Sequence, residues 1–270
     1  MRERNIIIGV ALCVWNGSKT IEKTVSSIIN QSYIGKVNII ILDNRSDDNT
    51  VKLLKKIKKK NKKKNINIKI LIDKKKRNVV AAQNYLIKKY FKKFEYFFLA
   101  TDDEYYHRNF IASAINKLTK QKLDLVYTNY QIVNSQGSVL SKTNKPIYSF
   151  KKSKFLNLSN FIIYRNINPI IFGIYRTKSF MELQNYYNYF DQSMSNHDNL
   201  FIFNFLLNKK VGNINKNYFY FLSKNRNLIE KLRKSGPKYW KLSSLISIFK
   251  YQFNFSVKIS KSIANSKDLK

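Results

Sequence analysis

Four groups of polar and charged residues each follow an apolar run in the first part of the chain. In chain order they are Asn16, Asp43, Arg77–Asn78 and Asp102–Glu104. Carboxylate oxygens are ligands that Mg²⁺ prefers, and a guanidinium group offers a fixed fork of donors to phosphate. If the fold brings these groups together, they form a site for an anion, a divalent metal ion, or both.

The apolar runs before these groups are rich in β-branched and aliphatic residues, which is typical of strands covered on both faces. They span residues 6–15, 37–42, 66–72 and 96–100. Between them, apolar residues recur at helical spacing, as at Ile21, Val25 and Ile28. This alternation predicts an α/β fold with a parallel sheet and right-handed crossovers. Ligands of such sheets bind beyond the carboxyl ends of the strands, where the four polar groups stand.

The composition limits the class of protein. Of the 270 residues, 44% are hydrophobic, which is enough for a packed core. The 51 Lys and Arg residues exceed the 16 Asp and Glu residues, which gives a net charge of +35. Lys far outnumbers Arg, whereas proteins that read base edges favour Arg, so specific nucleic-acid binding is not expected. An anionic lipid or an anionic substrate accounts for the charge at least as well.

The single cysteine and the N-terminal residues indicate the compartment. Cys13 alone cannot form an internal disulfide or a zinc site of several thiolates, and it favours the reducing cytosol. Arg2 and Arg4 precede an apolar run, as in a secretory signal. The turn at Asn16–Ser18 and the helical pattern after it favour a buried strand instead.

Five motifs in the first half resemble, in the same order, those of family 2 glycosyltransferases with the GT-A fold. They are Trp15–Gly17, Asn30–Tyr33, Asp43–Thr50, Arg77–Asn84 and Phe98–Asp103. The resemblance implies a Rossmann-like, mostly parallel central sheet flanked by helices. It also implies an inverting enzyme that moves a sugar from a nucleotide-diphosphate sugar, with a UDP-sugar the expected donor, to a hydroxyl of a glycan or lipid-linked acceptor.

The resemblance assigns roles in donor binding to residues of these motifs. Trp15 and Asn16 are expected to line the pocket for the nucleobase. Asp43 is expected to accept a hydrogen bond from the base. Arg77 is expected to contact uracil or a phosphate.

Asp102 is the expected metal ligand, through which Mg²⁺ or Mn²⁺ neutralises the diphosphate leaving group. Asp103 is expected to support the metal site or to orient the sugar. Two residues depart from the family pattern. Ala100 stands in place of the first Asp of the usual Asp-x-Asp, and Val80 stands in place of a common Gly.

The second half is expected to supply the acceptor site and the base. Residues 123–130 and 131–140 predict paired strands. Phe172–Arg176 resembles the family segment that precedes the catalytic acid, and a helix is predicted at 200–207. By the resemblance Asp198 is the general base that takes the proton of the acceptor hydroxyl, with Asp191 the alternative.

The chain is predicted to divide into a GT-A domain at 1–215 and a C-terminal basic amphipathic helical extension at 216–270. Within the extension, residues 239–263 predict a helix that lies on an anionic membrane or packs on protein. No stretch of the sequence is long and apolar enough to span a bilayer. The expected setting is bacterial cell-surface polysaccharide or lipopolysaccharide synthesis, in the cytoplasm or on the inner face of the cell membrane.

Two other functions stay open on the sequence alone. A nucleotidyltransferase shares the alternating architecture, but that class prefers a Gly-rich phosphate loop with Arg after the first strand, which Trp15–Ser18 lacks. A non-catalytic protein that binds nucleic acid or another polyanion would bind its partner in a salt-sensitive way without Asp102 and Asp198.

Overall fold

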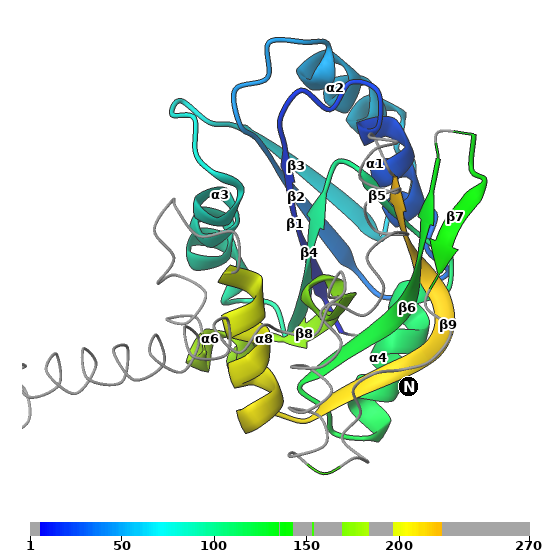
Figure 1. Ribbon diagram of the computed structural model, residues 1–270. Coiled ribbons are helices and arrows are strands. Elements are labelled where there is room, and N and C mark those ends of the chain that lie inside the picture. The colour runs from blue at the N-terminus through cyan, green and yellow to red at the C-terminus, as the bar shows by residue number, and fades with distance from the viewer. Residues whose placement is uncertain (1–5, 135, 143–152, 154–168, 184–196, 223–270) are drawn as a thin grey trace, which may run out of the picture.

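The computed structural model describes residues 6–134, 136–142, 153, 169–183 and 197–222. In that part of the chain nine strands form one sheet. The order of eight of them is β3-β2-β1-β4-β8-β6-β9-β5, and β7 pairs with β6. The fold is therefore α/β, as expected, with helices packed on both faces of a central sheet (Figure 1).

The first half of the sheet is parallel. Its strands are β1 (Ile8–Val14), β2 (Val37–Asp43), β3 (Ile66–Ile72) and β4 (Tyr96–Thr101). The helices between them are α1 (Ile21–Ile29), α2 (Thr50–Lys60) and α3 (Val79–Leu86), the last extended by a π-helical turn, η2 (Ile87–Phe91). The predicted alternation of strands and helices is confirmed, and the carboxyl ends of all four strands meet at one edge of the sheet.

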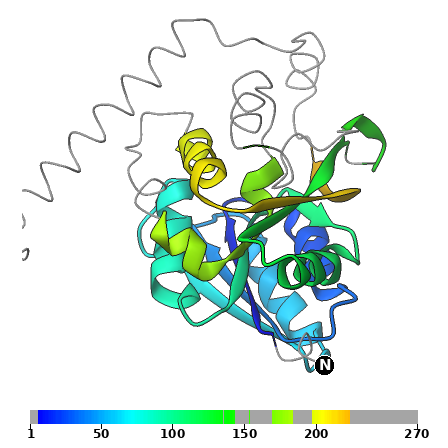
Figure 2. The same ribbon diagram turned by 90° about the horizontal axis from the view of Figure 1, so that it is seen from below.

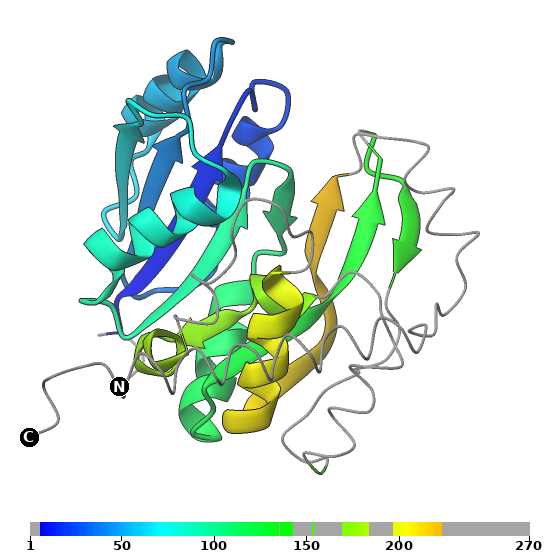
Figure 3. The ribbon, with the colours of Figure 1, turned by 60° about the vertical axis from the view of Figure 1, so that its left-hand side comes forward.

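The two faces of the sheet carry separate apolar clusters because side chains alternate along each strand. Val10 and Leu12 of β1 pack in one cluster with α1, α2 and α4 (Phe110–Lys120). Ala11 and Cys13 pack in the other with α3, α6 (Thr177–Glu182) and α8 (His197–Asn208). Figure 3 shows α3 and α8 on the same side of the sheet. Every residue of β1 is buried, and burial of each large apolar side chain stabilises the fold by roughly 1.5–3 kcal/mol. Strand β1 is therefore at the centre of the fold.

The second half of the sheet is mixed. It contains β5 (Glu104–Tyr106), β6 (Leu125–Val133), β7 (Val139–Lys142), β8 (Ile174–Arg176) and β9 (Val211–Leu222), with a 3-10 turn, η3 (Pro169–Phe172), before β8. The short strand β8 runs antiparallel to both β4 and β6 and so joins the two halves. The long strands β6 and β9 run parallel and side by side (Figure 2).

The strands predicted at 123–130 and 131–140 do pair, as the antiparallel strands β6 and β7. The predicted boundary between them is wrong, because β6 continues to Val133 and β7 begins at Val139. The last strand, β9, runs from Val211 through Leu222. Two register shifts leave Asn215, Lys216 and Tyr218 without a paired residue in β6, although Asn215 Oδ1 accepts from Asn129 Nδ2 at 2.8 Å, and the strand continues past them.

Residues 216–222 form the last part of β9. The division of the chain into two domains stays a prediction, and the helix predicted at 239–263 lies outside the described residues. Among the helices that the structure describes, none has the length and apolar character required to cross a membrane.

Candidate functional site

A cavity of about 440 Å³ opens at the carboxyl edge of the parallel strands. Its walls come from the ends of β1, β2 and β4, from the loop between β3 and α3, and from α3. They are Cys13, Val14, Trp15, Asn44, Lys76, Arg77, Asn78, Val79, Ala82, Thr101 and Asp102. Three of the predicted donor-site residues, Trp15, Arg77 and Asp102, therefore line one cavity.

Trp15 and Lys76 face each other at this cavity. The Lys76 Nζ lies 3.7 Å from the centroid of the Trp15 ring. Such a contact contributes about 0.5–1 kcal/mol at an exposed site. The Trp15 side chain remains 49% exposed, so it offers a large aromatic surface to a flat ligand.

Arg77 is held by an acid that the sequence analysis did not single out. Its Nε lies 2.5 Å from Asp73 Oδ2, and its Nη2 lies 3.4 Å from Asp73 Oδ1. The guanidinium carbon also stands 4.8 Å from the ring centroid of Tyr85. These contacts fix the guanidinium beside the cavity while its side chain stays 29% exposed.

Asn44 clamps the backbone of the same loop. Its Nδ2 donates to the Arg77 carbonyl at 2.6 Å, and its Oδ1 accepts from the Arg77 N–H at 2.8 Å. An amide is the side chain that can donate and accept in this pairing. The end of β2 therefore positions the loop that carries Lys76 and Arg77.

The loops after β1 and β2 are tied together. Asn16 has a φ of +52°, which Asn tolerates better than most residues. Its N–H donates to Ser46 Oγ at 2.9 Å, and its Oδ1 accepts from the Asp47 N–H at 3.1 Å. The side chain thus holds two loops together and does not line the cavity, and a contact with the base stays a prediction.

A second tie joins Ser18 to Asp48, whose Oδ2 accepts from the Ser18 N–H at 3.0 Å. Burial acts to raise the pKa of Asp48, but hydrogen bonds from Thr50 and Ser18 outweigh it and lower the pKa to about 2. The carboxylate is therefore ionised at neutral pH, which strengthens the tie between the loops.

Asp43 lies at the end of β2 and is fully buried. Its Oδ1 accepts from the Ser46 N–H at 3.0 Å, while its Oδ2 has no hydrogen-bond partner in the described part of the chain. Asp43 does not line the cavity, whereas the next residue, Asn44, does. Its predicted contact with the base stays a prediction.

Asp102 is positioned by Thr20, the residue before α1, and by Thr24 of α1. Thr20 Oγ1 donates to Asp102 Oδ2 at 2.9 Å, and Thr24 Oγ1 donates to the Asp102 carbonyl at 2.9 Å. A Cβ on Gly17 would lie 2.8 Å from Asp102 Oδ2, so a glycine at that position permits this approach. Asp103 accepts from Thr101 Oγ1 at 2.7 Å and does not line the cavity.

The donor set at Asp102 fits a divalent cation that a ligand helps to hold. In the described part of the chain no three His, Cys, Asp or Glu residues cluster as a complete metal site. Mg²⁺ commonly binds through one or two carboxylates together with substrate phosphates and water. The Asp102 carboxylate in the cavity wall meets this requirement.

Two further titratable groups are structural. Burial raises the pKa of Glu104 to about 8, although hydrogen bonds from Thr101 and Tyr106 act to lower it. Burial also raises the pKa of the Cys13 thiol far above its ordinary value, with a further contribution from the Asp73 charge. The Cys13 thiol is therefore protonated and is not a nucleophile.

Asp198 is the second residue of α8, the helix that shares an apolar cluster with α3 (Figure 3). Its backbone therefore stands on the face of the sheet that carries the Cys13 and Ala82 wall of the cavity. Its side chain, and Asp191 as a whole, lie outside the described residues. The role of Asp198 as a base stays a prediction.

Several solved structures are similar to the chain, and two of them hold a nucleotide sugar. S. aureus TarS 1–349 in complex with UDP-GlcNAc is 19% identical, with a TM-score of 0.62, and the match covers 83% of this chain and 60% of that one. The mannosyltransferase PcManGT from Pyrobaculum calidifontis, in complex with GDP-Man and Mn²⁺, is 11% identical, with a TM-score of 0.59, and the match covers 86% and 61%. These similarities support the GT-A type of fold. The chain spans about three fifths of the length of both proteins.

A search of the curated proteins gives no match. A protein-family model does match, and it covers residues 9–190, which include every element from β1 to α6 that forms the cavity and its supports. The chain belongs to glycosyl transferase family 2.

Proposed function

We propose that the protein transfers a sugar from a nucleotide-diphosphate sugar to a hydroxyl group of a glycan or lipid-linked acceptor, with inversion at the anomeric carbon. The observation that carries the proposal is the cavity itself. Three separate loops bring four side chains to this cavity. They supply an exposed aromatic ring (Trp15), two cations (Lys76 and Arg77) and a carboxylate (Asp102). This combination suits a base, a diphosphate and a metal-bridged leaving group.

The donor is a nucleotide sugar, and we propose a UDP-sugar. TarS was solved with UDP-GlcNAc and the mannosyltransferase with GDP-Man, so related folds accept both nucleotides. Lys76 and Arg77 would stabilise the negative charge that grows on the diphosphate as it leaves. A Mg²⁺ or Mn²⁺ ion bound with Asp102 would supply further neutralisation of that charge.

In the proposed reaction the acceptor oxygen attacks the anomeric carbon and the bond from that carbon to the diphosphate oxygen breaks. Asp198 would take the hydroxyl proton as the new bond forms, and the nucleotide diphosphate would leave with the electron pair. The placement of α8 on the same face of the sheet as the cavity supports this role.

The setting that we propose is bacterial surface polysaccharide or lipopolysaccharide synthesis at the inner face of the cell membrane. The net charge of +35 supports contact with an anionic surface or an anionic acceptor. A lipid-linked acceptor would bring the hydroxyl to such a surface.

The test is thermal stabilisation of the protein by UDP, GDP, dTDP and CMP sugars, each with and without Mn²⁺. The expected result is stabilisation by one nucleotide that the metal increases, with the increase due to the metal lost in Asp102→Asn. Asp47→Asn is the matched control, because it removes one exposed acid near the same edge of the sheet and outside the cavity wall. A response to no nucleotide, or equal loss in both variants, would contradict the proposal.

A further inference from the structure

A second cavity, of about 370 Å³, lies at the amino end of β4. It is formed where the segment before β4 meets β8 and α6, and Figure 1 shows α6 and β8 at the end of β4 opposite to the loops after β1 and β3. The six residues of β4 separate the two cavities by about 17–20 Å. The second cavity is therefore not part of the donor site.

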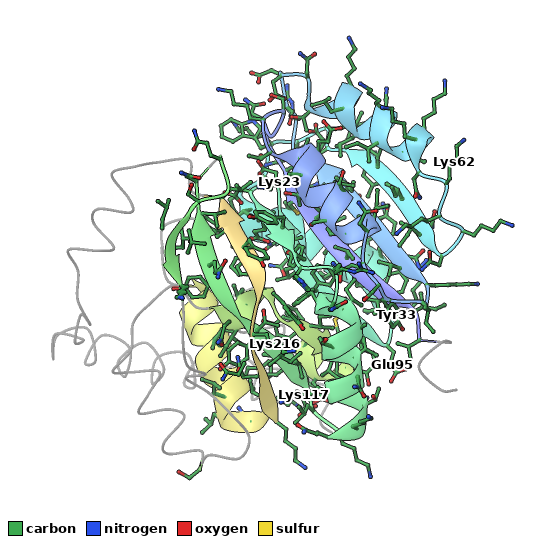
Figure 4. The ribbon with its side chains drawn as sticks, turned by 90° about the vertical axis from the view of Figure 1, so that its right-hand side faces the viewer. Lys23, Tyr33, Lys62, Glu95, Lys117 and Lys216 are labelled. Carbon is green, nitrogen blue, oxygen red and sulfur yellow. The ribbon has the colours of Figure 1, made fainter. Side chains whose placement is uncertain are left out.

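Three cations line this cavity. Lys92 comes from the turn after η2, and Arg176 and Lys178 come from the junction of β8 and α6. Glu95, labelled in Figure 4, is the one acid among the described lining residues, and its side chain is 53% exposed. Its Oε1 lies 3.7 Å from Arg176 Nη1, which is long for an ion pair. The lining thus keeps an excess of two positive charges.

Thr177 adds a polar group without a partner. Its residue is 4% exposed, and its N–H donates to the Glu95 carbonyl at 2.9 Å. The buried Oγ1 makes no hydrogen bond within the described part of the chain. Burial of an unpaired hydroxyl is unfavourable, and such groups call for an explanation by a ligand, a water molecule or a function.

The rest of the wall is apolar. Phe94 is 5% exposed, and Met181 is partly buried. A cavity of this volume, with an apolar side and a few convergent polar groups, has the character of a small-molecule site. The cations select an anion, and the apolar side selects a ligand that also carries carbon.

We propose that this cavity binds a phosphate monoester. Lys92, Arg176 and Lys178 hold the phosphate oxygens, with the Thr177 hydroxyl as a further donor, because Arg and Lys give charge-assisted hydrogen bonds to phosphate. The carbon portion lies against Phe94 and Met181. A free sugar phosphate and the headgroup of a phosphate-bearing lipid share this chemistry.

The experiment is calorimetric titration of the full chain with glucose 1-phosphate, in the presence of saturating UDP to fill the donor cavity. Glucose is the neutral control. A parallel arm measures binding to phosphatidylcholine vesicles with and without phosphatidic acid. Binding of the sugar phosphate assigns the site to a free ligand, and binding of the phosphatidic acid vesicles alone assigns it to a lipid headgroup.

The variant Lys92→Gln/Lys178→Gln is expected to weaken binding at least tenfold. Lys55→Gln/Lys59→Gln is the matched control, because it removes the same charge from the exposed face of α2 and should retain wild-type affinity. Equal loss in both variants would show a general charge effect and overturn the proposal. Absence of binding in both arms, or competition with UDP, would also overturn it.

Thr177→Val separates a ligand contact from a folding role. It removes the hydroxyl at nearly constant shape, so the melting temperature of the free protein should not fall, while affinity for the phosphate should fall several-fold. Unchanged affinity would refute the assignment of Thr177 to the ligand. If UDP does not bind, the Lys92→Gln/Lys178→Gln and Thr177→Val variants still locate the ligand at this cavity, so failure of the proposed function would leave the test intact.

Discussion

Replacement of Arg77 by Ala is expected to lower stability and donor binding by separable amounts. Arg77 forms a two-point contact with Asp73, whose side chain is 7% exposed against 29% for Arg77. Exposed ion pairs contribute about 0.2–1 kcal/mol, whereas removal of one partner of a buried pair costs about 3–5 kcal/mol. Because Asp73 is buried and Arg77 is partly exposed, Arg77→Ala is expected to lower the unfolding free energy by about 1–3 kcal/mol.

A double-mutant cycle with Asp73→Asn isolates that cost. Once the Asp73 charge is gone, Arg77→Ala no longer leaves a buried carboxylate unpaired, and its effect on urea unfolding should fall below about 1 kcal/mol. The Asp73 Oδ1 also accepts from the Lys75 N–H at 3.2 Å, and an Asn side chain retains that acceptor. The loop should therefore keep its backbone conformation in Asp73→Asn.

Donor binding gives the second readout. If Arg77 contacts uracil or phosphate, Arg77→Ala should raise the Kd for UDP about tenfold or more in both backgrounds, as loss of a charged hydrogen bond of about 1.5–3 kcal/mol requires. Lys74→Ala removes an exposed cation of the same loop and should change neither quantity. The reasoning is refuted if Arg77→Ala costs the same stability in both backgrounds, or if its effect on UDP disappears in Asp73→Asn.

Three further outcomes follow from the site. Asp102→Asn should abolish the effect of Mn²⁺ on UDP binding, which calorimetry measures. Its unfolding free energy, measured with urea, should change by less than about 1 kcal/mol because an amide can still accept from Thr20. An unchanged effect of Mn²⁺ would count against the metal role. Gly17→Ala should lower transfer activity, since the new Cβ would lie 2.8 Å from Asp102 Oδ2 and displace that carboxylate; full activity would contradict the steric argument. Glu104 has a folded pKa of about 8, above its ordinary 4.5, so its contribution to stability is complete below pH 4.5 and is lost as pH rises toward 8. Between pH 5 and pH 8, the unfolding free energy of Glu104→Gln should therefore fall less than that of the wild type. Urea unfolding in the presence of a metal chelator measures this, and parallel plots of unfolding free energy against pH would exclude Glu104 as the cause.

The first half of the fold was predictable because its patterns are local. Strands β1 and β4 are almost entirely apolar, as burial on both faces demands. Strand β3, at the edge of the sheet, alternates apolar residues with the exposed Asn67 and Lys69, and Ile66–Ile72 matches the predicted bounds. The carboxyl-edge rule then placed Trp15, Arg77 and Asp102 around one cavity without knowledge of any side-chain position.

The second half was less predictable because its strand ends are set by partners far along the chain. The run Tyr218–Leu222 is apolar, but Asn215–Asn217 interrupts the pattern before it, and the continuation of β9 depends on pairing with β6 and β5 on either side. The Asp73 partner of Arg77 was missed for a similar reason. Asp73 stands next to the lysines at 74–76, and in the sequence such a charged stretch predicts an exposed side chain. Only the packing around the end of β3 shows that Asp73 is buried.

Asp43 shows where the sequence identified the right segment but not the residue that lines the cavity. Asp43 is the last residue of β2 and is fully buried, whereas the next residue, Asn44, lines the cavity. Successive residues at the end of β1, Cys13 and Val14, both line the cavity, so strand alternation alone does not predict this difference. The motif that carries the family resemblance identifies the segment, and the packed structure shows which of its residues reaches the cavity.

Each loop of the cavity is fastened to a neighbouring loop by protein groups alone. The ties are Asn16 to Ser46 and Asp47, Ser18 to Asp48, Asn44 to Arg77, and Thr20 to Asp102. A site held in this way loses little conformational freedom when a donor binds, so more of the contact energy appears as affinity. Substitution of Ser46 or Asp48, which take part in the ties but lie outside the cavity wall, should therefore weaken donor binding without removing a contact from that wall. The carboxyl-edge rule places the residues near one another, and these hydrogen bonds fix their geometry.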